Sequence, residues 1–118
     1  MRILTEAGMR TAIEAMMLQN FPLYCAQLGP RGCTEAVREA VARGRSLNFQ
    51  EAQLPAWVSL EFAFGPDFAT NPAYPWAQEI LAERSVPSEP RMEQLRSSAI
   101  FYLARLAENE KVPAEVEA

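Results

Sequence analysis

Apolar residues recur every three or four positions along most of the chain, and no segment alternates steadily between apolar and polar positions. The first period is typical of amphipathic helices, whereas steady alternation is typical of half-buried strands. The pattern therefore predicts an all-α protein, a compact single-domain bundle of five to six helices.

Start and stop signals divide the first half of the chain into three predicted helices. Thr5 is a capping residue, and the helix after it runs to about Gln19. A second, short helix follows Asn20 and ends at Gly29, and a third begins at Thr34 or just before it. On the first helix we expect a buried stripe at helical spacing, made of Met9, Ala12, Ile13 and Met16.

The pattern in the second half of the chain predicts three more helices. The first of them, at residues 54–64, is apolar on nearly every side. Such a helix either lies at the centre of a fold or is covered by a partner. The next starts near residues 74–76 and ends at about residue 83 or 84, and the last runs from Ser88 to about Glu108. We expect residues 1–109 to form the domain and the acidic residues 110–118 to be a flexible tail.

A long connection rich in aromatic and proline residues separates the fourth and fifth helices, and this composition predicts an ordered loop. Gly65 is placed to end the preceding helix, and Asp67 is placed to accept backbone N–H groups in the turn after it. We expect Phe68, Pro72 and Trp76 to pack on the core and hold the loop in place.

Glu61 lies in the same helical sector as Trp57, so this carboxylate borders an aromatic face. Three roles are open to it: a surface residue at a helix end, the partner of a buried arginine, or a functional acid with a raised pKa. An enzyme that used Glu61 together with Asp67 would need both carboxylates to face one pocket.

Phe101 breaks the pattern of the last helix, because it falls between Ser97 and Arg105 on the polar face. Isolated exposed aromatic residues are common, but aromatic residues are also enriched where proteins bind each other. The residues that we expect at a partner-binding surface are Phe101, Trp57, Glu61 and Tyr74.

The composition disfavours most enzyme classes, nucleic-acid binding and cofactors. The chain contains no histidine, which is the usual general base and a frequent zinc ligand. It has no glycine-rich phosphate loop, and its 11 basic residues are interleaved with 15 acidic ones, for a net charge of -4. We therefore predict no catalytic residues, no cofactor, no metal and no nucleic-acid partner.

Two further sequence features concern the compartment. No secretory signal and no apolar run of membrane-spanning length is present, so we expect a cytoplasmic protein without membrane insertion. The two cysteines, Cys25 and Cys33, flank the turn at Gly29. In a reducing cytosol we expect both to be thiols, with a disulfide between them as the alternative.

The chain resembles a family of small, mostly uncharacterised all-helical bacterial proteins found near type VI secretion effector genes. The resemblance spans roughly residues 5–107, and Pro66 and Asn71 stand where that family has a basic and an acidic residue. It rests on Phe21-Pro22, Cys25, Leu28-Gly29, Phe62, Phe64-Gly65, Asp67-Phe68, Asn71-Pro72, Pro75-Trp76-Ala77 and Ile80-Leu81.

This resemblance implies a non-enzymatic, protein-binding role. The expected function is that of an adaptor or chaperone-like accessory that binds a secretion effector, its chaperone or a spike component. The alternative is an immunity protein that binds and neutralises a cognate toxin.

Overall fold

Five α-helices and one 3₁₀ turn form the regular structure of residues 5–117, which are the residues that the computed structural model describes. This part of the chain contains no strand. The predicted all-α, single-domain bundle is confirmed. The elements are α1 (Glu6–Asn20), α2 (Pro22–Ser46), the 3₁₀ turn η1 (Glu51–Gln53), α3 (Leu54–Phe64), α4 (Pro75–Ala82) and α5 (Ser88–Glu117).

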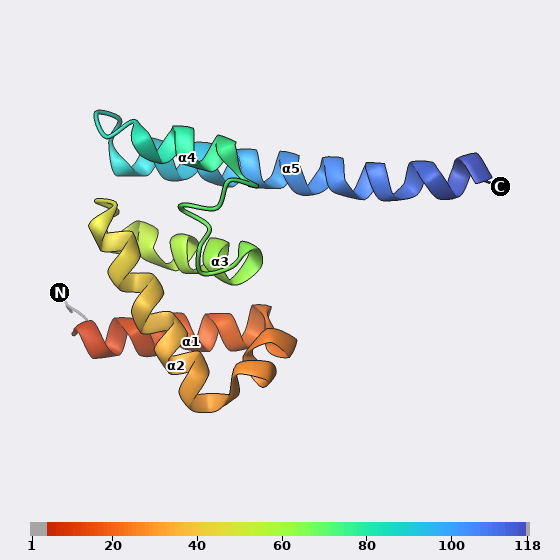
Figure 1. Ribbon diagram of the computed structural model, residues 1–118. Helices are drawn as coiled ribbons and strands as arrows, with labels where there is room; N and C mark the ends of the chain where they lie inside the picture. Colours follow the sequence, from red (N-terminus) through yellow and green to blue (C-terminus); the bar gives the residue numbers. More distant parts are fainter. Residues whose placement is uncertain (1–4, 118) are drawn as a thin grey trace.

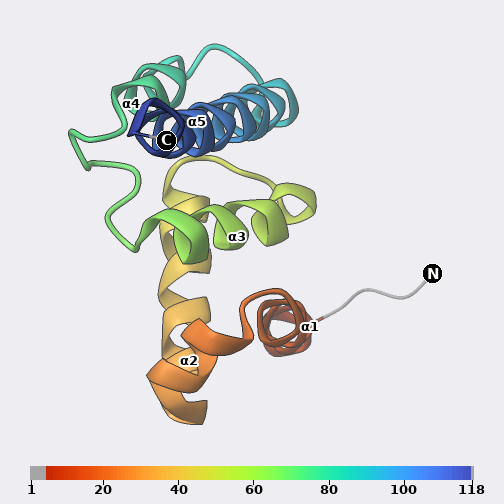
Figure 2. The same ribbon diagram turned by 90° about the vertical axis from the view of Figure 1, so that its right-hand side faces the viewer.

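The helices lie in three layers, with α1 on one side, α3 in the middle, and α4 together with α5 on the other side (Figure 2). Helix α2 runs past the layers of α1 and α3 and packs against both of these helices. The second half of α5 extends well beyond α4 (Figure 1), and the molecule measures 58 × 37 × 26 Å. The fold therefore carries a helical projection on one side.

Helix α5 continues to Glu117, so its predicted end near Glu108 is wrong. The sequence signal for that end was the acidic, proline-containing composition after residue 109, which does not stop the helix here. The flexibility expected for residues 110–118 stays a prediction.

The predicted break between the second and third helices lies where expected, inside α2. Gly29 has φ +77° and ψ +167°, a conformation that breaks the helical hydrogen-bond pattern and that glycine adopts without strain. The expected start of the next segment, at Thr34 or just before it, is wrong. The hydroxyl of Thr34 donates to the carbonyl oxygen of Pro30 at 3.0 Å, which is a contact across one turn of helix. Thr34 thus lies one turn inside a helical segment that resumes at Pro30.

Helix α1 begins as predicted, with the backbone N–H of Gly8 donating to the hydroxyl oxygen of Thr5 at 2.9 Å. Its buried stripe consists of Met9, Ile13 and Met17. Met16 was expected in that stripe but is 41% exposed, because the face of α1 that meets α2 and α3 follows a spacing of four residues.

Helix α3 is the centre of the core, which explains its apolar surface. Its Trp57 side chain is fully buried and lies between the rings of Phe49 and Phe68, at centroid distances of 5.6 and 5.7 Å. Helices α1, α2 and α5 and the turn η1 all contact α3. The chain's own helices cover it, so its composition requires no partner.

Candidate interaction surface

The connection between α3 and α4 is a compact series of turns that begins at Gly65. This glycine ends α3 with φ +112°, and its carbonyl oxygen accepts the N–H of Phe68 at 3.1 Å. The turn directs Phe68 back into the core, where its side chain is fully buried. Pro72, in contrast, is exposed, so the expectation that it packs on the core is wrong.

Asp67 and Asn71 hold the connection together. The main-chain carbonyl of Asp67 accepts the N–H groups of Thr70 and Asn71, each at 2.9 Å. The Asp67 carboxylate accepts the side-chain N–H of Asn71 at 3.2 Å, whereas the sequence predicted that it would accept backbone N–H groups. The carbonyl of Asn71 also accepts the side-chain amide of Gln78 at 2.7 Å, which ties the loop to α4.

Five aromatic rings gather where this connection meets α4 and α5. Their paired centroid distances lie between 5.0 and 6.1 Å, mostly in tilted or edge-to-face arrangements that favour aromatic contact. The cluster fixes the position of α4 beside α5. Its members are Phe64, Phe68, Tyr74, Trp76 and Tyr102.

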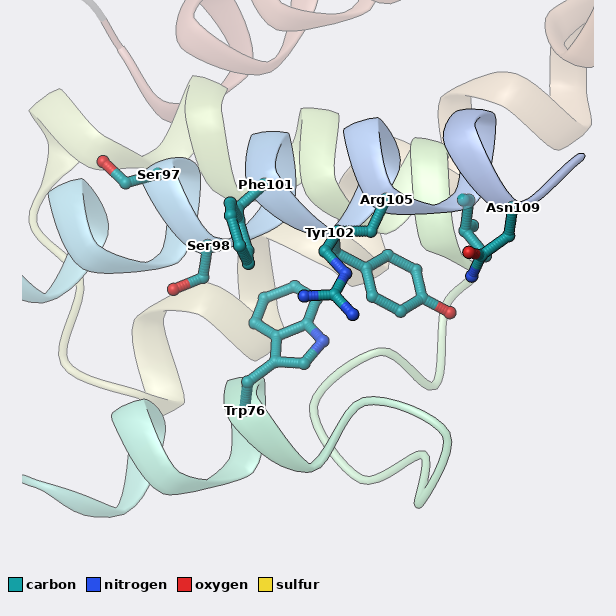
Figure 3. Close-up of a pocket in the computed structure, with 8 residues that line it drawn as sticks. Trp76, Ser97, Ser98, Phe101, Tyr102, Arg105 and Asn109 are labelled. Atoms are coloured by element: carbon teal, nitrogen blue, oxygen red, sulfur yellow. The ribbon is translucent and has the colours of Figure 1, made fainter. Parts of the chain in front are cut away.

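Beside this cluster, α4 and α5 enclose an open groove of about 580 Å³, which we call the α4–α5 groove. Figure 3 shows that Trp76 points from α4 towards α5, and that Phe101, Tyr102 and Arg105 point from α5 to the same place. The remaining lining residues are Ser97, Ser98, Leu106 and Asn109.

The groove combines exposed apolar surface with one exposed cationic side chain. Phe101 is 64% exposed and Leu106 is 43% exposed. The Nε1–H of Trp76 is buried and has no hydrogen-bond partner among the described residues. The guanidinium of Arg105 lies 5.7 Å from the centre of the Phe101 ring and forms no ion pair within the described residues. An apolar ligand with a hydrogen-bond acceptor fits this arrangement.

The structure separates the four residues that were expected at a partner-binding surface. Phe101 lies in the groove, and Tyr74 is half-buried in the aromatic cluster behind it. Trp57 and Glu61 do not lie on this surface, which corrects the expectation, because they are 0% and 3% exposed. Both face the core side of α3, since the chain's own helices surround that helix.

Glu61 forms an ion pair with Arg43 of α2. The Arg43 guanidinium donates from Nε to Oε2 at 2.9 Å and from Nη2 to Oε1 at 2.6 Å. The hydrogen bond to Glu61 raises the pKa of Arg43 above its ordinary value, against the opposing effect of burial. Of the three roles open to Glu61, the geometry matches the arginine partner, although Arg43 itself remains 38% exposed.

The two carboxylates of the hypothetical enzyme have different neighbours. Glu61 lines a pocket of about 220 Å³ with Arg43 and Tyr24, and Asp67 is not part of its lining. Asp67 instead contacts Asn71 within the loop. The structure does not bring the two acids into a common pocket.

Cys25 and Cys33 are buried thiols on either side of the Gly29 break, with their Sγ atoms 3.4 Å apart. Burial and the neighbouring Cys25 thiol raise the pKa of Cys33 to about 12. Among the side chains that the structure describes, those of residues 5–109, no group of three or more Cys, Asp or Glu residues is arranged to hold a metal ion. None of the described helices combines the length and the apolar character that crossing a membrane requires.

Comparison of the chain with protein-family models, with curated proteins and with solved structures gives no match. The geometry of the groove is therefore the basis for a functional proposal.

Sequence reasoning identified Phe101 but missed the residues that accompany it. Tyr102 and Leu106 were not among the residues expected at a binding surface, yet both line the groove. Arg105 follows Phe101 by four positions, a spacing that places both side chains on one helical face. That spacing was the available signal, whereas the approach of Trp76 from α4 depends on tertiary packing.

Proposed function

We propose that this chain is a non-enzymatic protein-binding module that receives an apolar side chain of a partner protein in the α4–α5 groove. The observation that supports the proposal is the convergence of Trp76, Phe101, Tyr102 and Arg105 on one open hollow. Tryptophan, tyrosine and arginine are the residues most enriched among those that dominate binding energy at protein interfaces.

The chemistry of the groove describes the partner segment. Phe101 and Leu106 offer apolar surface, which favours an aliphatic or aromatic anchor. The exposed Arg105 guanidinium is a hydrogen-bond donor, and an arginine suits a carboxylate. The partner segment in this proposal therefore carries an apolar anchor next to an acidic residue.

The biological role proposed for this module is that of an adaptor or chaperone-like accessory of a type VI secretion effector. This part rests on the sequence resemblance. An adaptor binds its effector and releases it again, and a groove of a few residues suits such a transient contact better than a large apolar interface.

The test combines export with binding. The gene is deleted from its host, and export of the effector encoded beside it is measured before and after complementation with the wild-type chain. Binding of the purified effector to the purified chain is measured by calorimetry. We expect deletion to reduce export and Phe101→Ser to weaken binding by about tenfold or more.

Two matched variants sharpen the assignment to the groove. Trp76→Phe keeps an aromatic ring in the wall of the groove, so it should weaken binding less than Phe101→Ser does. Ile100→Ser changes the neighbouring residue, which is 67% exposed and lies outside the groove, and should leave binding unchanged. Equal binding by the wild type and Phe101→Ser would reject the groove as the binding site.

The deletion strain and the complemented strain also test the alternative that the chain is an immunity protein. If co-expression of the chain protects cells from the neighbouring effector while export is unaffected by deletion, the adaptor role is wrong and the chain is an immunity protein. Such a result, combined with loss of protection in Phe101→Ser, would still place binding at the groove.

A further inference from the structure

The break in α2 brings two cysteines into contact. Cys25 lies before Gly29 and Cys33 lies after it, and their Sγ atoms are 3.4 Å apart. On an unbroken helix, residues eight positions apart are separated by about 12 Å along the axis, so their side chains could not touch. The positive φ of Gly29 turns the short first part of α2 away from the direction of the long second part (Figure 1). The contact between the two thiols therefore depends on the break.

The short first part of α2, residues 22–28, is attached to the rest of the fold by side chains. The ring of Tyr24 packs edge-on against Phe62 of α3, with the ring centroids 5.3 Å apart. Pro30 follows the break and has no N–H group to donate across it. A Cβ atom at Gly29 would meet nothing within 4 Å, so the space beside the break is open. The break is therefore a place where the two parts of α2 can separate locally.

Only a small movement separates the two thiols from a covalent bond. A disulfide holds its sulfur atoms about 2.05 Å apart, so the Sγ atoms of Cys25 and Cys33 would have to approach by about 1.4 Å. This is less than the length of one carbon–carbon bond. A disulfide at this position would join the short part of α2 to the long part across Gly29.

We propose that Cys25 and Cys33 are a redox-sensitive pair that closes to a disulfide in the folded chain and then holds the two parts of α2 together. The oxidant is a low-molecular-weight disulfide, of which oxidised glutathione is the probe used below. Neither cysteine lines the α4–α5 groove, so this inference does not depend on the proposed function.

The reaction is a thiol–disulfide exchange in two steps. One cysteine, as its thiolate, attacks a sulfur of the small disulfide, and one small thiol leaves. The other cysteine then attacks the protein sulfur of this mixed disulfide, and the second small thiol leaves. The two cysteines together lose two electrons, which reduce the small disulfide, and their two protons end on the two released thiols.

Burial determines how fast this exchange proceeds. Both cysteines are buried, and the raised pKa of Cys33 leaves little of its thiolate, the attacking form, at neutral pH. The exchange therefore waits for local opening at the break. The position of the equilibrium, in contrast, depends on how well the folded chain accommodates the bond, and it is the equilibrium that tests the proposal.

The first experiment measures the equilibrium between dithiol and disulfide in the wild-type chain, in mixtures of reduced and oxidised glutathione. The folded chain and the chain in about 8 M urea are each brought to equilibrium from the reduced and from the oxidised side, and mass spectrometry gives the disulfide fraction. We expect the equilibrium constant for the intramolecular disulfide to be at least about tenfold larger in the folded chain. An equal or smaller constant in the folded chain overturns the proposal, because the contact is then ordinary packing of two thiols.

The second experiment tests whether the bond holds the break. The oxidised wild type should unfold about 5 °C or more above the reduced wild type, and hydrogen exchange at residues 23–28 should be slower in the oxidised chain. The control is Cys25→Ala combined with Cys33→Ala, in which the oxidant should change neither measurement. The comparison of the two wild-type forms stands even if this variant does not fold. A disulfide that leaves both the unfolding temperature and the exchange unchanged would contradict the proposed link between the two parts of α2.

Discussion

The guanidinium of Arg43 on α2 meets the carboxylate of Glu61 on α3 in a two-point contact, with 2.9 Å from Nε to Oε2 and 2.6 Å from Nη2 to Oε1. Glu61 is 3% exposed, whereas Arg43 reaches solvent. A buried carboxylate needs such a partner, because burial without one leaves an uncompensated charge. The pair therefore fixes how α2 crosses the central helix.

Replacing Arg43 with methionine should destabilise the fold. The variant leaves Glu61 buried without its two donors, and we expect a loss of about 2 kcal/mol in the free energy of unfolding, less than for a fully buried pair because Arg43 is partly exposed. Urea unfolding at neutral pH measures it. The matched control is Arg38→Met, whose pair with Glu35 is about half exposed on both sides, so this variant should change stability far less than Arg43→Met does. Equal effects of the two variants would contradict the role of the pair.

Gly44→Ala should destabilise the protein although alanine favours helices. A Cβ atom at Gly44 would lie 2.8 Å from Cδ1 of Trp57 and 2.9 Å from Cδ2 of Leu54, both fully buried. Overpacking costs about 1–3 kcal/mol, which exceeds the gain of about 1 kcal/mol in helix propensity. Gly32→Ala is the control in the same helix, since its new Cβ meets only the Cβ of half-buried Leu28 at 3.3 Å. Thermal unfolding should rank Gly44→Ala as the less stable of the two.

Arg91→Lys should weaken the attachment of α5 to the rest of the fold. The Arg91 side chain is 1% exposed, donates to the carbonyl oxygens of Leu47 and Val86 at 2.8 and 3.2 Å, and lies over the Phe49 ring. Burial lowers the pKa of Arg91, which means that keeping this side chain charged inside the protein is unfavourable. Lysine lacks the planar group that makes these contacts together, and we expect a loss of about 2 kcal/mol.

The control for this variant is Arg84→Lys, because Arg84 is exposed. It should leave the free energy of unfolding nearly unchanged in the same chemical denaturation experiment. If Arg91→Lys is equally neutral, the two carbonyl contacts do not contribute to stability.

Alkaline pH should lower the free energy of unfolding of the wild type more than it lowers that of the Cys33→Ala variant. The pKa of Cys33 rises from 9.0 to about 12 on folding because the thiol is buried beside Cys25. Above pH 9 the unfolded chain loses this proton while the folded chain keeps it. The contribution of the Cys33 thiol to the free energy of unfolding is therefore complete below pH 9 and is lost as the pH rises towards 12.

The measurement compares the free energies of unfolding of the two proteins, under reducing conditions, at about pH 8 and about pH 10.5. The difference between wild type and variant cancels the other groups that titrate in this range. A difference that does not change with pH would show that the Cys33 thiol titrates alike in the folded and unfolded chain.

Local signals in the sequence were sufficient for most of the helices. Thr5 caps α1 as expected, because capping depends on residues three positions apart. Gly29 interrupts α2 and Gly65 ends α3, because positive φ angles at these positions are easily adopted by glycine alone. The end of α5 was missed, since an acidic composition weakens a helix without stopping it.

The candidate surface was predictable only in part. Phe101 could be identified because it breaks the polar face of its own helix. The burial of Trp57 and Glu61 could not, because the hydrophobic pattern of α3 is equally consistent with covering by a partner and covering by the chain's own helices. The contact between Arg43 and Glu61 joins two helices, and helical periodicity carries no information about which faces of separate helices meet.

The sequence by itself determined where α1 begins, where glycine breaks α2 and ends α3, and that one aromatic residue stands on a polar face, because capping, glycine conformation and helical periodicity act over a few neighbouring residues. Only the tertiary structure decided that α3 is enclosed by its own chain, that Trp76 and Phe101 form one groove, and that half of α5 projects from the body. These features depend on contacts between residues far apart in the chain, which form only when all the helices pack together.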